Sequence, residues 1–463
     1  MQDSEASPPQ PISTDWQRRV ARAFGDTPVA SLAAKIEPGV SLDPLLPAAS
    51  AAPLWSRARK GWTRLQRLGM AAGRETIAAA FETGADGFEI VVAGSAADHG
   101  DGLPPEAVPT LLELLPLDRC ALRLAPGPSG TALADAIDSA VKAARLDPSL
   151  LRIAFGLDPL GAFTGGSAPT AAWASESGRF AATVNRLAER GYRGPFATAD
   201  ARLIHAAGGT ASMELGYALA ALLALLRALL DGGVEERLAA SAIDVALAAD
   251  EDQFATIAKF RAIRLLQARL LAASALPPSA LALHGETSWR MLAAEDMQSN
   301  VIRATIAALS AGLGGADSLA VLPFTAATTG GDAEAERLAL TTQAILIEEA
   351  HLARVADPGA GSGTITALTV ALAEAAWQQF QTIERDGGLP SALAGGRLQA
   401  EIAQAAAQRT AEISEGMRGI VGVTLFRAEG IAQTLAPSAE PSPSAPVALR
   451  AQRTAEKFES LVS

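Results

Sequence analysis

Residues 243–252 read Ile-Asp-Val-Ala-Leu-Ala-Ala-Asp-Glu-Asp, and this stretch sets the interpretation of the whole chain. The compact apolar run at 243–248 predicts a short buried strand, and the acidic residues at 250–252 predict the point where that strand ends. Similar runs elsewhere are followed by Ala/Leu-rich stretches, as at 333–349, where apolar residues recur at the spacings of three and four that indicate a helix. The chain is therefore expected to alternate strand and helix.

Eight runs of this kind are found along the chain. They lie at 87–92, 121–125, 152–156, 195–198, 243–248, 280–284, 318–323 and 352–356. Eight strands that alternate with eight helices over about 300 residues are typical of a parallel (β/α)8 TIM barrel. A doubly wound sheet is the alternative, but no Gly-x-Gly-x-x-Gly follows the first strand, which disfavours its dinucleotide-binding version.

Composition excludes several classes of protein. The chain has 463 residues, 49% of them hydrophobic, and a formal net charge of -12. No Lys/Arg cluster indicates a nucleic-acid site, and the acidic balance disfavours an anionic membrane surface. The longest apolar run, at 215–226, is too short to span a membrane and suits a buried helix.

A single cysteine, Cys120, rules out an intrachain disulfide and any cysteine-rich metal site. It lies in an apolar run, so we expect a small core residue rather than a nucleophile. The N-terminus has no signal-peptide pattern, and these features together favour a cytoplasmic protein with no metal site.

Changes in composition predict four segments. Residues 1–60 form an N-terminal arm that contacts another subunit, with a short helix at 15–24, and residues 61–385 form the barrel. Residues 386–435 form a helical extension, and 436–463 form a Pro/Ser-rich linker and a short tail.

Several predicted strand ends carry Asp, Gly, Pro or Ser. These ends lie at 158–161, 249–252, 285–288 and 357–362. Barrel enzymes bind ligands at the carboxyl ends of their strands, but the same residue types also cap helices. Both interpretations stay open, and capping is favoured for any single residue.

Seven stretches in sequence order resemble the methylmalonyl-CoA mutase family. They include Thr-Ser-Trp-Arg-Met-Leu at 287–292, Ala-Gly-Leu-Gly-Gly-Ala-Asp-Ser at 311–318 and Val-Ala-Asp-Pro-Gly-Ala-Gly-Ser at 355–362. The others lie at 252–261, which is similar to the family's helix after the fifth strand, and at 321–326, 342–349 and 420–423. The resemblance covers the chain from about Trp62 to its C-terminus.

The resemblance implies a barrel that holds an acyl-CoA thioester in its bore. In this family a separate flavodoxin-like domain carries adenosylcobalamin, which supplies the radical chemistry of a 1,2-rearrangement. The histidine that ligates cobalt lies in an Asp-x-His-x-x-Gly motif. None of the four histidines here, His99, His205, His284 and His351, is in that pattern, so we expect no cofactor on this chain.

Two substrate-facing positions depart from the family pattern. Where catalytic members carry a tyrosine near the first strand, this chain has Arg67, which fills the vacated pocket, pairs with a local acid or lies exposed. After the fourth strand the family's Tyr-His becomes Ile204-His205, in a segment two residues shorter, as in the family's small subunits. His205 either still donates to a thioester carbonyl or, as we favour, is a structural residue bonded within its loop.

The seventh predicted strand has lost three polar residues. Its family pattern of His, Asn and Asp becomes Ala320, Leu322 and Thr325, whereas Gln343 and Glu348 are retained downstream, where internal polar contacts are favoured over chemistry. A bore lined by Ala, Leu and Val can close on itself, so we expect a filled or narrowed channel and no catalytic residue in this chain.

Three hypotheses follow. The leading one is a non-catalytic small subunit of a heterodimeric mutase, in which a large catalytic subunit binds adenosylcobalamin and the acyl-CoA. The second is the acyl-CoA-binding half of a split mutase whose cobalamin domain is a separate chain. The third is a stand-alone binding or regulatory barrel.

Overall fold

The computed structural model describes residues 14–25, 29–56, 61–70, 72–164, 172–328, 332–427 and 448–459. Its centre is a sheet of eight parallel strands in the order β6-β5-β4-β3-β10-β9-β8-β7. The strands are β3 (Thr63–Leu68), β4 (Gly87–Val91), β5 (Ala121–Ala125), β6 (Arg152–Ala154), β7 (Ala197–Asp200), β8 (Ile243–Ala249), β9 (Leu283–Thr287) and β10 (Ser318–Ala320).

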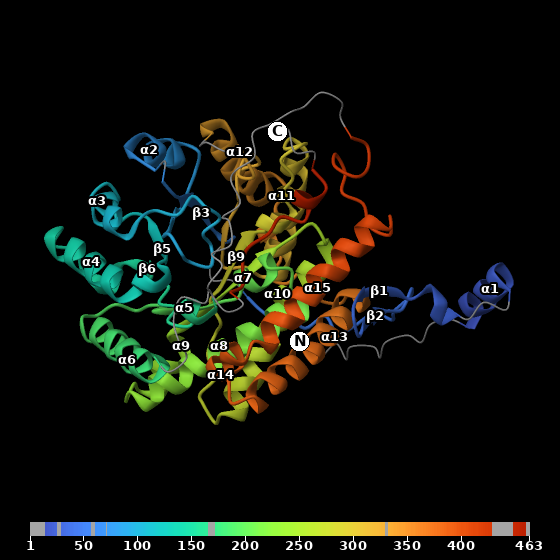
Figure 1. The fold of residues 1–463 in the computed structure, drawn as a ribbon, viewed down its shortest axis with the longest axis horizontal. Helices are drawn as coiled ribbons and strands as arrows, with labels where there is room; N and C mark the ends of the chain where they lie inside the picture. The colour runs from blue at the N-terminus through green and yellow to red at the C-terminus, as the bar shows by residue number, and fades with distance from the viewer. Residues whose placement is uncertain are drawn as a thin grey trace, which may run out of the picture.

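The two outer strands of this sheet, β6 and β7, meet through the chain that follows β6. Leu157 N donates to Phe196 O at 3.0 Å, and Thr198 N donates to Leu157 O at 3.1 Å. The sheet therefore curls into a nearly closed barrel, which confirms the predicted (β/α)8 fold (Figure 1).

Helices surround the strands, as Figure 1 shows. The helices that follow successive strands are α2 (Arg74–Glu82), α3 (Val108–Leu112), α4 (Gly130–Ala143), α5 (Gly161–Thr164), α6 (Trp173–Glu189), α7 (Arg202–Ala206), α8 (Ala211–Asp231), α9 (Glu236–Ser241), α10 (Gln253–Ala273), α11 (Ser299–Gly314) and α12 (Ala333–Ala344). The C-terminal helices are α13 (Gly363–Arg385), α14 (Leu389–Gly395) and α15 (Arg397–Ser414).

Strand β8 has all seven of its residues buried, because it has neighbours on both edges, helices outside and the bore inside. Helix α8 is long and apolar enough to cross a membrane, but 78% of its most apolar window is buried in the protein, where α8 packs against α13, α10 and α6. The expectation of a buried core helix at 215–226 is confirmed. Cys120 is also a core residue, and burial raises the pKa of its thiol to about 11.

One predicted strand is wrong and one was missed. Residues 352–356 do not form a strand, because Leu352–Arg354 is a turn of 3-10 helix that follows His351 in a left-handed conformation. The missed strand is β3, whose Thr-Arg-Leu-Gln-Arg-Leu sequence hides its apolar alternation: Arg64 points outward to Asp86, and Arg67 points into the bore. Because β3 is the first strand of the barrel, each later strand ranks one higher than the sequence predicts. His205 therefore follows the fifth strand, α10 follows the sixth, and residues 318–320 form the eighth.

The predicted helix at 15–24 is present as α1 (Thr14–Phe24), which stands away from the barrel in Figure 1. Beyond it, the hairpin of β1 (Ala34–Glu37) and β2 (Val40–Leu42) and the strap at 43–56 lie against the chain's own barrel. Leu54 N donates to Asp357 Oδ2 at 2.9 Å, and Ala49 N donates to Gly361 O at 3.1 Å. Much of the arm is therefore used within the subunit.

The C-terminal tail at 448–459 lies across the carboxyl ends of three barrel strands. Leu449 N donates to Thr164 O after β6, Gln452 N to Ala206 O after β7, and Thr454 N to Arg290 O after β9. A buried ion pair between Arg453 and Glu459, 2.9 Å apart, closes the tail on itself. Residues 436–447 of the predicted linker lie outside the described residues.

The strap can be tested at Gly363, the first residue of α13, where a Cβ atom would lie 1.9 Å from the carbonyl oxygen of Pro47. We expect Gly363→Ala to lower the free energy of unfolding by about 1–3 kcal/mol, as overpacking does, and to speed proteolysis within 43–56. The matched control is Gly178→Ala in α6, whose Cβ meets nothing within 4 Å and which we expect to be neutral or stabilising in urea denaturation. Equal effects of the two changes would contradict the packing of the strap.

Candidate functional site

The interior of the barrel is lined by charged side chains. Every second residue of a strand faces the bore, and at these positions β4, β5, β8 and β9 carry Glu89, Arg123, Asp244 and Glu286, all at most 4% exposed. The expectation of an interior filled by Ala, Leu and Val is therefore wrong. The bore is filled, but by ion pairs.

At the lower level of the bore, Arg123 connects three strands. Its guanidinium lies 2.5 Å from Asp244 Oδ2, donates to Thr198 Oγ1 at 3.1 Å, and has Nε 3.6 Å from Glu89 Oε1. His284 completes this level, with Nε2 3.3 Å from Glu89 Oε2 and Nδ1 2.9 Å from Ser318 Oγ.

At the upper level, Arg202 of α7 reaches into the bore between three carboxylates. Its Nη1 lies 2.9 Å from Glu89 Oε1 and 3.2 Å from Glu286 Oε2, and its Nη2 lies 2.7 Å from Asp200 Oδ2. Arg67 joins the same group, 3.1 Å from Glu286 Oε2. Arg67 and Arg202 thus share one oxygen of Glu286. Glu89 contacts both Arg123 and Arg202, so the two levels form one connected network, which we call the bore network.

Electrostatics favour the charged forms of Glu89, Glu286 and Arg202 in the bore network. Burial opposes ionisation of Glu89, but Arg202, His284 and Arg123 outweigh it and hold the pKa of this carboxyl well below its usual range. Burial likewise opposes ionisation of Glu286, yet Arg202 and Arg67 lower its pKa. The carboxylates in turn favour the charged form of Arg202. Burial lowers the pKa of Arg202, but Asp200 and Glu89 raise it to well above the usual value.

The side chain of Arg67 is buried and paired. Of the three alternatives left open by the sequence, it therefore fills the vacated pocket and pairs with local acids, and it does not lie exposed. Besides Glu286 it contacts Asp101, whose Oδ1 lies 2.5 Å from Nη2. Beside it, His99 approaches Glu286 Oε1 at 3.4 Å and stacks on Trp289 with ring centroids 4.9 Å apart. A cavity of only about 10 Å³ remains near Arg123, Asp158 and Asp200, which is space for roughly one water molecule.

His205 lies apart from Arg67, on the side of the barrel formed by β8 and β9. Its Nε2 lies 2.8 Å from Ser288 Oγ and 3.7 Å from Asp250 Oδ2, and its Nδ1 lies 3.4 Å from Glu214 Oε2. The ring is therefore held by side chains from other elements and not, as expected, by its own loop. Burial and the charge of Arg290 lower the pKa of His205 well below its usual value, so the ring is neutral at pH 7.

Gln343 and Glu348 lie outside the bore, in α12 and in the π-helical turn Ile345–Glu349 that follows it. Gln343 Oε1 accepts from Trp62 Nε1 at 3.0 Å, and Glu348 lies 3.9 Å from Arg64 on the surface. The four candidate residues Arg67, His205, Gln343 and Glu348 are thus not brought together.

The polar strand ends are divided between capping and the bore network. Asp158, Asp252 and Ser362 accept backbone N–H groups at the first turns of α5, α10 and α13, so capping is the correct interpretation for these three. Glu286 and Ser288 instead contact Arg202 and His205. At 320–325, Ala320 and Leu322 are buried, as their sequence suggests.

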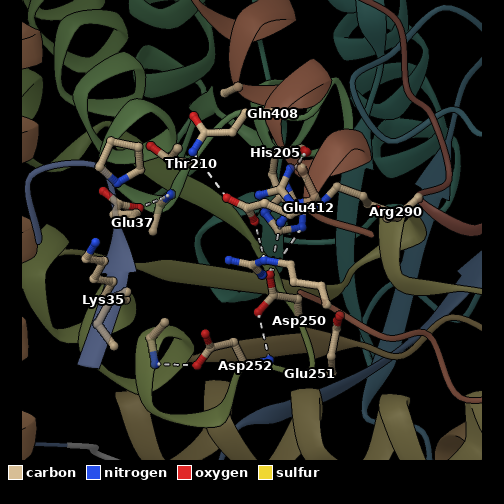
Figure 2. A pocket seen from close by; sticks show the side chains of 18 of the residues that line it. Lys35, Glu37, His205, Thr210, Asp250, Glu251, Asp252, Arg290, Gln408 and Glu412 are labelled. Carbon is tan, nitrogen blue, oxygen red and sulfur yellow. Dashed lines mark hydrogen bonds and ion pairs between the residues drawn. The ribbon is translucent and has the colours of Figure 1, made fainter. Parts of the chain in front are cut away.

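A larger cavity, of about 830 Å³, opens beside His205 and is shown in Figure 2. Its walls are the β1–β2 hairpin, the chain after β8 and β9, and α15. In Figure 2 Arg290 and Asp250 lie on one side of this cavity, and Lys35 and Glu37 of the hairpin lie on the other.

Sequence reasoning missed most of the bore network. Glu89, Arg123 and Asp244 each stand alone within an apolar strand, in Gly-Phe-Glu-Ile-Val, Ala-Leu-Arg-Leu-Ala and Ile-Asp-Val-Ala-Leu. A lone charge in a buried strand requires a partner, so this signal was available. Arg202, which lies after its strand, gives no such signal.

Comparison with known sequences identifies the family of this chain. A sequence model of the family described as methylmalonyl-CoA mutase matches residues 106–457. The chain belongs to the methylmalonyl-CoA mutase family. It is 38% identical over 351 residues to the methylmalonyl-CoA mutase small subunit of Streptomyces virginiae, and 38% identical over 339 residues to the probable small subunit of Mycobacterium tuberculosis H37Rv.

The mutase large subunit of Streptomyces virginiae is more distant, at 33% identity over 230 residues, which cover 49% of this chain and 31% of that subunit. The two small-subunit alignments cover 74% and 70% of this chain but 55% and 53% of those relatives. The chain thus spans about half the length of the small subunits it matches.

The bore network can be tested at its central carboxylate. We expect Glu89→Gln to leave Arg202 and Arg123 undercompensated and to cost about 3–5 kcal/mol of unfolding free energy, the usual effect of breaking a buried ion pair. Glu384→Gln, which removes the partner of the largely exposed Arg227, is the control and should cost less than about 1 kcal/mol. A loss at Glu89 no larger than the control's would show that the network is not held together as described.

The two buried histidines should each lower stability in mild acid, whereas Asp158, whose pKa burial raises to about 7, should act in the opposite direction. The pKa values of His205 and His284 are lowered in the folded protein, chiefly by burial. At a pH between these lowered values and the unfolded pKa near 6.5, the unfolded chain therefore binds more protons than the folded chain. We expect a loss of about 1 kcal/mol per histidine between pH 6.5 and 5.5 in urea titrations. His205→Gln should remove about half of the pH dependence that the two histidines contribute. An unchanged pH profile would contradict the lowered pKa of His205.

Proposed function

We propose that the chain is the small, non-catalytic subunit of a heterodimeric adenosylcobalamin-dependent methylmalonyl-CoA mutase. In this reading a large subunit interconverts methylmalonyl-CoA and succinyl-CoA and binds both substrate and cofactor. The bore network is the observation that carries the proposal. A catalytic barrel of this kind must admit a thioester along its axis, whereas here Arg67, Arg202 and Glu286 occupy that axis and satisfy one another.

Opening the bore to a substrate would be costly. An acyl-CoA chain could enter only if these side chains were moved aside, and separating a buried pair leaves uncompensated charge in a medium of low polarity. The positions of Ala320 and Leu322 support the same reading, because neither side chain can donate a hydrogen bond to a thioester.

The residues of this chain do not fit cobalamin, the group that supplies the radical when it is bound. His284 is buried in the bore network, His99 is stacked on Trp289 and His205 is bonded to Ser288. His351 follows the π-helical turn Ile345–Glu349, and Ile347 of this turn lies against Gly61, just before β3. This turn therefore lies at the amino ends of the barrel strands, not at the carboxyl ends. The tail at 448–459 also lies across the strand ends where a cap would approach. We therefore assign the cofactor to the partner subunit.

The partner is proposed from the comparisons. The same organism, Streptomyces virginiae, has relatives of this chain named small and large subunits. A duplicated barrel that kept its interface and lost its pocket would give this pair. Among the described residues of the N-terminal arm, helix α1, which projects from the barrel with a basic last turn, is the segment we propose to contact such a partner.

The decisive experiment assays this chain alone, the large mutase homologue from the same source, and the two together, each with adenosylcobalamin and methylmalonyl-CoA. We expect the chain alone to show no turnover, and a one-to-one complex to form on gel filtration and turn over. In that complex, the paired change Arg67→Gln and Glu286→Gln, which neutralises both charges together, should leave kcat within about twofold. Turnover by the chain alone, or a fall of a hundredfold or more in the double variant, would overturn the proposal.

A split mutase is the second candidate, favoured by the cavity of about 830 Å³ beside the retained His205. It would require this chain to bind acyl-CoA by itself. Calorimetry of the isolated chain with methylmalonyl-CoA separates the two: micromolar affinity would favour the split mutase, and the absence of heat would favour the small subunit.

A further inference from the structure

The cavity beside His205 carries two arginines that the proposed function does not use. Arg290 follows β9, and Arg409 lies on α15. Arg290 Nη1 donates to the carbonyl oxygens of Gly209 at 2.8 Å and His205 at 2.9 Å, and Arg409 Nη1 donates to Gly208 O at 2.9 Å. Because their acceptors are neighbours in the chain, the two guanidinium groups lie side by side on one wall of the cavity.

These two arginines have one carboxylate between them. Asp250 Oδ2 lies 3.1 Å from Arg290 Nη2. Among the residues that the structure describes, Arg409 has no carboxylate within 4.0 Å, and its hydrogen bond goes to a neutral carbonyl. The third arginine of the cavity, Arg418, is neutralised by Glu412 at 2.6 Å. Within the described part of the chain, Arg290 and Arg409 thus have Asp250 as the one carboxylate in direct contact, although the cavity lining as a whole has five cationic side chains and five carboxylates.

Repulsion between the two arginines is the physical consequence. The charge of Arg290 and then burial lower the pKa of Arg409 to about 9, and Asp250 offsets this only in part. An arginine rarely loses so much of its preference for the charged form, and an anion placed between the two groups would restore it.

The arginines are also held in place before any ligand arrives. Arg290 is fixed through two carbonyl acceptors and Asp250, and its backbone carbonyl accepts from Thr454 N of the tail at 2.9 Å. Arg409 is fixed by helix α15 and by Gly208. Guanidinium groups arranged in this way bind planar or tetrahedral oxyanions through paired hydrogen bonds.

We propose that this cavity binds a small organic oxyanion, with a carboxylate or phosphate group seated between Arg290 and Arg409. The volume of about 830 Å³ suits a ligand larger than an inorganic ion. Glu251 and Asp252 on the cavity lining disfavour a ligand that is anionic along its whole length. The ligand is therefore anionic at one end and polar or apolar at the other. This site is independent of whether the barrel is a mutase subunit.

The test uses the full chain at constant ionic strength, with pyrophosphate and succinate as probes of phosphate and carboxylate binding, and succinamide as the uncharged control. We expect saturable stabilisation in thermal unfolding by at least one anion, a matching calorimetric isotherm, and no response to succinamide. Arg409→Gln should weaken binding at least tenfold, and Arg409→Lys should recover part of the affinity.

Arg227→Gln is the matched control, because Arg227 is a helical arginine far from the cavity lining and paired with Glu384. We expect its anion affinity to stay within twofold of that of the unaltered chain. Binding that Arg409→Gln and Arg227→Gln affect equally would place the anion elsewhere. If neither pyrophosphate nor succinate binds saturably, the proposal is overturned. Neither of these two negative results would affect the mutase assignment.

Discussion

The ion pairs at the centre of the barrel are the constraint on which the rest of the structure depends. Glu89, Arg123, Arg202 and Glu286 come from four separate segments and are almost fully buried. Removing such charges from water costs several kcal/mol per ion before any attraction is counted, so the barrel can close only when all the partners meet in the correct geometry. The network thus specifies one register of strands more strongly than it adds stability.

The same network changes what the barrel can do. In a family whose catalysis uses the bore as a substrate channel, this chain has an interior whose hydrogen-bonding groups are largely directed at one another. Arg67 illustrates the change: at a position where a neutral aromatic residue would face a substrate, a guanidinium bridges Glu286 and Asp101. Under the proposed function, the role of this chain would therefore rest on surfaces outside the bore, namely the arm, the tail and the cavity beside His205.

The two ends of the chain hold the barrel from outside. Asp357 accepts from the strap at Leu54 and also pairs with Arg261 of α10, so one buried carboxylate ties the N-terminal strap to the helical layer. At the other end, the tail fixes Arg290 while it crosses the strand ends. The tail contacts leave the carboxyl face of the barrel more covered than the strands alone would.

The sequence by itself determined the alternation of strand and helix, and with it the barrel, because apolar periodicity is local and survives in a single chain. It also determined the buried helix at 215–226, the core position of Cys120 and the lost polar residues at 320–325. It misplaced one strand, since Arg64 and Arg67 in β3 resemble a surface pattern until their partners are known. Only the tertiary structure decided that the bore is filled by charge, that Arg67 and His205 lie apart, and that Arg290 meets Arg409. These depend on residues up to about two hundred positions apart, and a charge is costly or harmless according to which partner the fold brings to it.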